Sequence, residues 1–168
     1  WGMHDYTLQG AQGAASFNEI IAEGYGKPQS AREFTELAQW VNYDGHRSLF
    51  ESRSKNRMGL LMWMSHPCWP SMVWQTYDYY LEPTAAYFAI KKASEPLHIQ
   101  WNPATDEVEV VNYSAGIHSH LTARVQILNM DASVAWEKET TVDSREDTTE
   151  KCIKLEFPET LSEVYFIK

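Results

Sequence analysis

The sequence has few of the residues and motifs that would hold a metal, a phosphate group or a lipid bilayer. Its two cysteines, Cys68 and Cys152, stand far apart, so they indicate neither a disulfide framework nor a metal site. A glycine-rich phosphate loop, HExxH, CxxC and GxSxG are all missing, and we therefore expect no metal and no cofactor. Because no run of about 18 apolar residues occurs, we also expect no membrane-spanning helix.

Basic residues are scarce as well. Fourteen Lys and Arg against 23 Asp and Glu give a net charge of −9. Nucleic-acid binding depends on clustered basic side chains that displace counterions from phosphates, so we expect no nucleic-acid partner. The charge is uneven, because residues 1–100 carry a net −2 and residues 101–168 a net −7, which suggests two structural units.

The start of the chain lacks the usual features of a natural beginning. Trp1 stands first, without an initiator methionine, a basic n-region or an apolar h-region, so we expect a piece of a longer protein. Two cysteines do not identify a redox compartment. The location is therefore unknown, and an extracytoplasmic location of the parent protein stays open.

The first hundred residues carry helical patterns. A short helix is predicted over residues 16–23. A second begins at the capping box formed by Ser30 and Glu33 and runs to Asn56, with a basic end that suits the helix dipole. A third runs from 83 to 94, with a proline in its first turn.

From residue 97 onward the apolar residues alternate with polar ones, which is typical of half-buried strands. Six such stretches at regular spacing predict an antiparallel β-sandwich. The expected domains are therefore 1–96 and 97–168. The predicted strands are LHIQW, EVEVVNY, LTARVQILNM, SVAWEKETTV, EKCIKLEF and EVYFIK.

Between the last two helices lies a stretch rich in aromatic residues. Gly59–Met64 is a continuous apolar run, typical of a parallel strand covered on both faces, and aromatic residues follow it. In α/β folds, ligands bind beyond the carboxyl ends of strands. Sugars offer C–H faces that stack on indole, and their hydroxyl groups need planar partners such as Gln75. The candidate substrate-binding residues are Trp63, Trp69, Trp74, Asp78 and His66. Alternatively, the aromatic residues other than Trp63 pack the last helix onto a sheet.

The histidines are weaker candidates. His118 and His120 could share one strand face, but no acid or cysteine with ligand spacing accompanies them, which favours an exposed loop. His4 stands next to Asp5, yet adjacent loop residues usually point apart. We therefore predict no catalytic residue from either pair.

The string GLLMWMSHPCWPSMVWQTYDYYLEPTAAYFAIKKASEPLHIQW, residues 59–101, resembles the end of the catalytic barrel of glycoside hydrolase family 2. Within that family it looks most like the branch of exo-β-D-glucosaminidases and plant-type β-mannosidases. The segments WGMHDY and AQWVNYDGHRSLFESRSKNRMG are similar to those that precede it. The resemblance implies a retaining glycosidase with a (β/α)8 barrel and flanking immunoglobulin-like sandwiches, acting on a terminal β-linked sugar.

By this resemblance, residues 1–96 are the end of the barrel, Gly59–Met64 is its eighth strand, and residues 97–168 begin the next sandwich. The fold class is thus an α+β fragment: the end of a (β/α)8 barrel followed by an immunoglobulin-like antiparallel β-sandwich. Trp63 would form part of the wall of the terminal-sugar pocket. Retention needs two carboxylates about 5 Å apart. The family places both on earlier strands, so we predict no catalytic residue here and no activity of the fragment alone.

Two further expectations follow. An immunoglobulin-like sandwich has about seven strands, so this one would lack its last. Exposed edges of the barrel or the sandwich invite self-association. The alternative to an enzyme fragment is a non-catalytic carbohydrate-binding or structural β-sandwich module. Whether the parent acts on glucosamine or mannose is left open.

Overall fold

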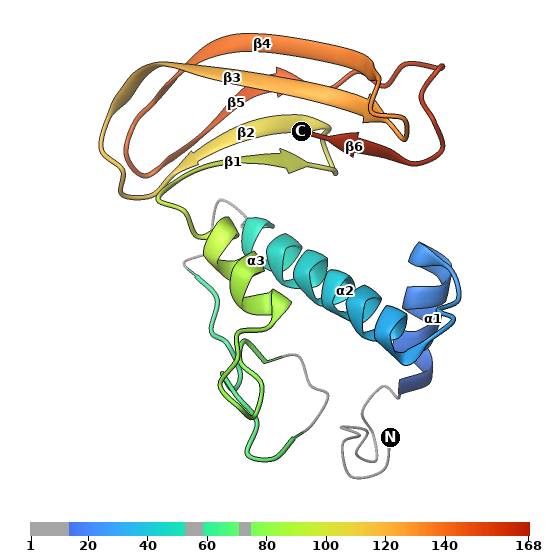
Figure 1. The fold of residues 1–168 in the computed structure, drawn as a ribbon. Helices are drawn as coiled ribbons and strands as arrows, with labels where there is room; N and C mark the ends of the chain where they lie inside the picture. The colour runs from blue at the N-terminus through green and yellow to red at the C-terminus, as the bar shows by residue number, and fades with distance from the viewer. Residues whose placement is uncertain (1–13, 53–58, 71–74) are drawn as a thin grey trace. The chain divides into compact units, whose positions relative to one another are not determined.

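The computed structural model describes residues 14–52, 59–70 and 75–168. The chain divides into two compact units, Trp1–Ser94 and Glu95–Lys168. Every described helix belongs to the first unit and every strand belongs to the second (Figure 1). The α+β class expected from the sequence is therefore confirmed. The division falls two residues before the predicted one.

The helices of the first unit are α1 (Ala14–Tyr25), α2 (Ala31–Glu51) and α3 (Ala85–Ala93). All three were predicted, but α2 ends at Glu51 and not at Asn56, and its predicted basic end lies outside the described residues. None of the described helices is both long and apolar enough to cross a bilayer.

The start of α2 follows the predicted capping box with one difference. Ser30 has extended backbone angles, and its side chain accepts a hydrogen bond from the Glu33 amide at 3.1 Å. The Glu33 carboxylate accepts from the amide of Gln29, one residue before the cap, at 2.7 Å. Both bonds satisfy amides that a helix start leaves without partners. The local sequence is thus sufficient to start this helix.

Helices α2 and α3 lie side by side in the first unit (Figure 1). Gln39 of α2 accepts a hydrogen bond from the backbone amide of Ala85, the first residue of α3, at 2.8 Å. Thr84 at the N-cap makes no side-chain capping bond to the helix, so Gln39 supplies a partner from another element. This link orients α3 and the loop that leads into it.

The predicted strand Gly59–Met64 is wrong for this chain, because the segment has irregular backbone. It is not covered on both faces either, since the side chain of Leu61 is 100% exposed. A strand needs backbone partners, and the described residues of the first unit contain no strand beside it. Hydrophobic pattern alone does not provide the hydrogen bonds that keep a segment extended.

The second unit contains the six predicted strands, arranged as two antiparallel three-stranded sheets with orders β1-β2-β5 and β4-β3-β6 (Figure 1). Strand β3 begins at His118, so the expectation that His118 and His120 lie in an exposed loop is wrong: both are strand residues. The strands are β1 (Leu97–Asn102), β2 (Glu107–Asn112), β3 (His118–Asn129), β4 (Val134–Ser144), β5 (Thr148–Lys154) and β6 (Tyr165–Ile167).

The core of the second unit joins both sheets. One buried cluster contains Val108 of β2, Ala123 and Val125 of β3, Ile153 of β5 and the following Leu155. In β3 the buried residues alternate as predicted. In β2 they do not, because all residues from Val108 to Asn112 are buried. The expectation that one face of this strand is wet is therefore wrong.

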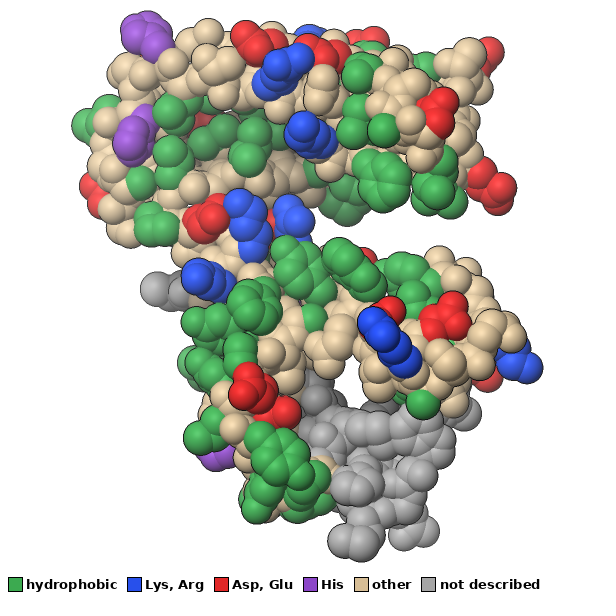
Figure 2. All heavy atoms as spheres, viewed as in Figure 1, with side chains coloured by type: hydrophobic (Ala, Val, Ile, Leu, Met, Phe, Trp, Pro, Cys, Tyr) green, Lys and Arg blue, Asp and Glu red, His purple; other side chains and the backbone are tan. Residues whose placement is uncertain are grey.

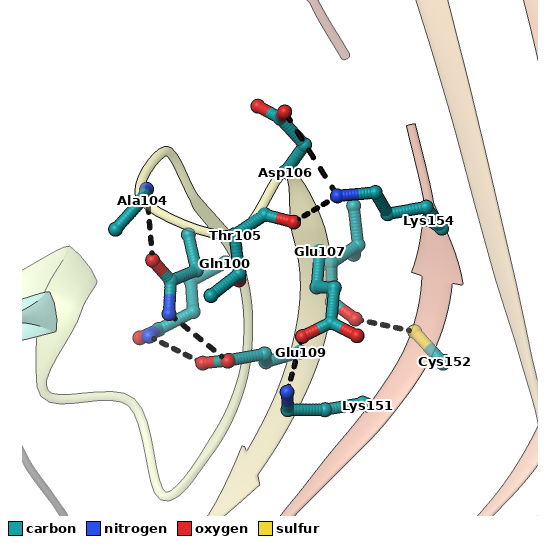
Figure 3. A network of polar contacts seen from close by, with 11 residues as sticks. Gln100, Ala104, Thr105, Asp106, Glu107, Glu109, Lys151, Cys152 and Lys154 are labelled. Carbon is teal, nitrogen blue, oxygen red and sulfur yellow. Dashed lines mark hydrogen bonds and ion pairs between the residues drawn. The ribbon is translucent and has the colours of Figure 1, made fainter. Parts of the chain in front are cut away.

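Part of the second buried face of β2 consists of polar side chains. The Glu109 carboxylate accepts hydrogen bonds from Gln100 and Asn102 of β1, at 3.3 and 3.2 Å (Figure 3). Glu107 on the same strand forms an ion pair with Lys151 of β5 (Figure 3). Buried polar groups are tolerated when they are hydrogen-bonded, so this network allows β2 to be enclosed on both sides.

One edge of the second unit is only partly paired. Strand β6 pairs with Ile127–Asn129 of β3, and Lys168 exchanges two 2.9 Å backbone hydrogen bonds with Gln126. Within residues 95–168, all of which the structure describes, Leu121–Val125 has a strand partner on one side only. That stretch is an open edge of the kind that favours strand addition.

Candidate functional site

Residues 59–84 are here called the aromatic loop, and hydrogen bonds join segments of its described part that are not adjacent in sequence. The carbonyl of Ser65 accepts from the Tyr77 amide at 2.9 Å and from the Thr76 hydroxyl at 3.0 Å. The Thr84 amide donates to the Thr76 carbonyl at 2.9 Å, and the Thr84 hydroxyl donates to the Gln75 carbonyl at 2.7 Å. The loop is thereby fastened to the start of α3.

The tryptophans of the aromatic loop are accessible to solvent. Trp63 is 75% exposed and Trp69 is 50% exposed, so each indole has surface available for stacking. The remaining predicted tryptophan, Trp74, lies outside the described residues. His66 is exposed, and its Nδ1 lies 3.1 Å from the hydroxyl of Ser65.

Asp78, predicted to contact substrate, organises the loop itself. Its Oδ1 accepts hydrogen bonds from the amides of Tyr80 and Glu82, at 2.8 and 2.9 Å. Its backbone amide donates to the Glu82 carbonyl at 3.0 Å, and its carbonyl accepts from Leu81 at 3.1 Å. An aspartate that bonds amides two and four residues ahead stabilises a turn. A substrate contact by Asp78 stays a prediction.

The polar partner suggested for sugar hydroxyl groups, Gln75, has a different place. Its side chain is buried, so its amide does not contribute to the exposed surface. Ser65 and His66, by contrast, lie beside the Thr76–Asp78 segment through the shared Ser65 carbonyl. The structure therefore brings His66 and Asp78 onto neighbouring segments of the loop.

The tyrosines of the aromatic loop divide into one that packs and two that are exposed, and the exposed pair was not predicted from the sequence pattern. Tyr77 packs on Tyr87 of α3 with ring centroids 5.4 Å apart, which agrees with the packing alternative. Tyr79 and Tyr80, however, contact each other and are exposed. The available sequence signal was Asp78, because an aspartate often forms a turn by bonding backbone amides a few residues ahead.

The aromatic loop contains only two acidic residues, Asp78 and Glu82, and no lysine or arginine. The described residues contain no cluster of three or more His, Cys, Asp or Glu side chains that could hold a metal ion. The chemistry that the loop itself offers is therefore stacking and hydrogen bonding to a polar ligand.

No protein-family model matches the chain. An exo-β-D-glucosaminidase of Streptomyces avermitilis is 36% identical over 132 residues, which are 74% of this chain and 15% of that protein. The crystal structure of the exo-chitosanase CsxA of Amycolatopsis orientalis superposes with a TM-score of 0.85 and 28% identity, over 92% of this chain and 19% of CsxA.

A β-D-mannosidase of Dictyoglomus thermophilum shares the fold, with a TM-score of 0.76 and 18% identity over 94% of this chain and 20% of that enzyme. The chain thus spans 15 to 20% of the length of these relatives. The similarity extends over both units, because it covers most of the residues on either side of the division. This chain is therefore homologous, over most of its length, to exo-β-D-glucosaminidases and β-mannosidases, which are enzymes of glycoside hydrolase family 2.

Proposed function

We propose that the chain is part of a retaining glycosidase whose parent protein removes a terminal β-linked sugar, of the glucosamine or mannose class, from oligosaccharides. The observation that carries this proposal is the exposed Trp63 in a hydrogen-bonded aromatic loop, within a chain homologous to exo-β-D-glucosaminidases. Indole faces stack on the C–H faces of sugar rings, and exposure leaves Trp63 free to do so.

In this proposal the first unit is the end of a (β/α)8 barrel, and the second is an immunoglobulin-like sandwich that lacks its last strand. Gly59–Met64 would become a strand only when the rest of the barrel supplies backbone partners on both sides. The full exposure of Leu61 supports this, because an apolar side chain that is free in this chain would be buried in a complete barrel.

The residues of this chain would bind and orient the sugar. Trp63 would form a wall of the pocket, Trp69 and Trp74 would extend the aromatic surface, and His66 and Asp78 would face the hydroxyl groups. Retaining hydrolysis needs a nucleophile and an acid/base about 5 Å apart. We place both carboxylates upstream of this chain, which leaves the 168-residue fragment inactive.

The test compares the fragment with a longer polypeptide expressed from the same gene and extended upstream. Hydrolysis of p-nitrophenyl β-D-glucosaminide and β-D-mannoside is followed by release of p-nitrophenol. We expect activity from the longer protein only. In it, Trp63→Ala should lower kcat/KM at least about tenfold, equivalent to about 1.4 kcal/mol, and Trp63→Phe should retain most of it. Activity of the fragment alone, or of neither protein, would overturn the proposal.

The exposure of both Trp63 and Trp69 in the isolated chain also favours a second candidate, a non-catalytic carbohydrate-binding module. The two are separated by titrating the fragment with glucosamine, mannose and their β-linked disaccharides while monitoring tryptophan fluorescence. Saturable binding without hydrolysis by the longer protein would support the module. Absence of any change would exclude it.

A further inference from the structure

A group of exposed apolar side chains lies at a turn of the aromatic loop. Tyr79, Tyr80 and Leu81, here called the tyrosine tip, are 45%, 72% and 66% exposed. A contiguous group of exposed apolar side chains is one of the features that mark a binding surface. The first unit therefore displays a second aromatic surface in addition to Trp63 and Trp69.

The tip is held in one conformation by bonds that do not involve any ligand. Asp78 accepts from the amides of Tyr80 and Glu82, and Tyr77 and Pro83 form a β-bridge below the turn. Leu81 has a φ of 65°, a backbone conformation that is unfavourable for leucine and persists because these bonds hold it. A surface fixed before binding loses little entropy when a ligand arrives.

The two rings also fix each other. Tyr79 and Tyr80 have ring centroids 5.2 Å apart and planes at 82°, an edge-to-face pair. Tyrosine has only two side-chain torsions, so it offers a rigid apolar face with a polar hydroxyl at low entropic cost. Such a ring suits a sugar, which has apolar C–H faces and polar edges.

The charge around the tip is negative. Asp78 and Glu82 flank it, and residues 59–84 contain no lysine or arginine. An apolar protein surface would not gain from these carboxylates, whereas the protonated amino groups of glucosamine units would. Figure 2 shows acidic side chains beside hydrophobic ones in the first unit.

The tip is connected to the segment that carries Trp63. Tyr77, three residues before Tyr80, donates its amide to the carbonyl of Ser65, two residues after Trp63. Chain reach of at most about 3.6 Å per residue then limits the separation of the Tyr80 and Trp63 backbones to roughly 20–25 Å. A chain of a few sugar rings spans such a distance.

We propose that Tyr80, oriented by Tyr79, is a second sugar-stacking site that takes an internal ring of a β-linked glucosamine oligosaccharide whose terminal ring lies against Trp63. This site rests on the proposed function for its ligand class. It would make affinity depend on chain length, because a longer oligosaccharide contacts both aromatic surfaces at once.

The test is isothermal titration of the 168-residue chain with glucosamine and with its β-linked dimer and tetramer. We expect the tetramer to bind at least about tenfold more tightly than the monomer. Tyr80→Ala should reduce the tetramer affinity to that of the monomer, and Tyr80→Phe should retain the difference. Phe88→Ala, which removes an exposed aromatic ring of α3, is the matched control and should change nothing. Helical circular dichroism at 222 nm verifies that each variant is folded.

Equal affinities for all three ligands, a tetramer preference that survives Tyr80→Ala, or no binding of any ligand would each overturn the site. These outcomes are separate from those of the proposed function, which depends on hydrolysis by the longer protein. An active parent whose fragment shows no length dependence would refute the tyrosine tip and leave the glycosidase in place.

Discussion

The two units of the chain bury their apolar side chains to different extents. Residues 95–168 bury aliphatic side chains from both sheets in one cluster. Among the described residues of the first unit, the buried apolar set is small: Ile21, Phe50, Pro67 and three alanines of α3. About half of its described large apolar side chains are exposed, including those of Trp40, Leu61 and Trp63. The described part of the first unit therefore exposes more large apolar side chains than it buries.

The two units also differ in net charge. Residues 95–168 hold 14 acidic and six basic side chains, a net −8, whereas residues 1–94 have a net −1. In the second unit some of the acidic side chains form exposed ion pairs with basic ones, as Glu137 does with Arg124. A charged surface over an apolar core is what a unit in water requires, and the nearly neutral, apolar surface of the first unit fits contact with further protein.

The largest effect should come from the core of the second unit. Ile127→Ala should lower the free energy of unfolding by about 2–5 kcal/mol, because the lost side chain is fully buried and leaves a cavity. Urea denaturation followed by circular dichroism measures this loss. Ile117→Ala, at a side chain that is 77% exposed, is the control and should change stability by about 0.5 kcal/mol or less. Equal losses would contradict the comparison.

Self-association should depend on the first unit. We predict concentration-dependent dimers in sedimentation analysis, with the apolar segment around Leu61 at the contact. Burying a leucine contributes about 1.5–3 kcal/mol, so Leu61→Glu should weaken association by about tenfold or more. Ile117→Glu in the second unit should leave it unchanged. A compact monomer at all concentrations would refute this prediction.

A smaller effect is expected at the start of α2. Ser30→Ala removes the hydrogen bond to the Glu33 amide and should cost about 1 kcal/mol, measured as reduced thermal stability of the helical signal at 222 nm. Ser30→Asp retains a capping oxygen and should restore most of the loss. If both variants lose the same stability, the cap does not determine where this helix begins.

The smallest effect concerns Glu137. Its hydrogen bond from Gln126, with a further contribution from Arg124, holds the pKa of this carboxyl below its ordinary value of about 4.5. A lowered folded-state pKa stabilises the protein above pH 4.5, and this contribution disappears as the pH falls through the folded-state pKa. Glu137→Gln should therefore make the free energy of unfolding slightly less dependent on pH below 4.5. Urea denaturation from about two pH units below to about two above that value measures this.

High salt provides the control for Glu137. The site is exposed, so about 1 M NaCl should reduce the charge contribution of Arg124 to the difference between the wild type and the variant. A difference that grows with salt would contradict an electrostatic cause.

Elements with local signals were predicted well. The alternation in β3 and the capping residues before α2 each depend on neighbours a few positions away, and all three helices and six strands are present. The resemblance to glycoside hydrolase family 2 also came from a local signal, the unusual order of aromatic residues and prolines in residues 59–101.

Features that need distant partners were not predictable in the same way. Gly59–Met64 has the composition of a buried strand but remains irregular, since no described strand of its unit lies beside it. Gln75 has an amide suited to a sugar but is buried, and Asp78 uses its carboxylate to hold a turn. The residue type shows which interactions a side chain is able to make, and the neighbouring residues in the fold decide which of these interactions it makes.

The sequence by itself determined the helices, the six strands and the resemblance to a glycosidase family, because propensity, periodicity and motif order are properties of neighbouring residues. The tertiary structure decided which aromatic rings face water, that β2 is enclosed on both sides, and that Tyr79 and Tyr80 form a fixed pair at the tip of the aromatic loop. These depend on hydrogen bonds and packing between segments that are far apart in the chain, for which no local pattern exists.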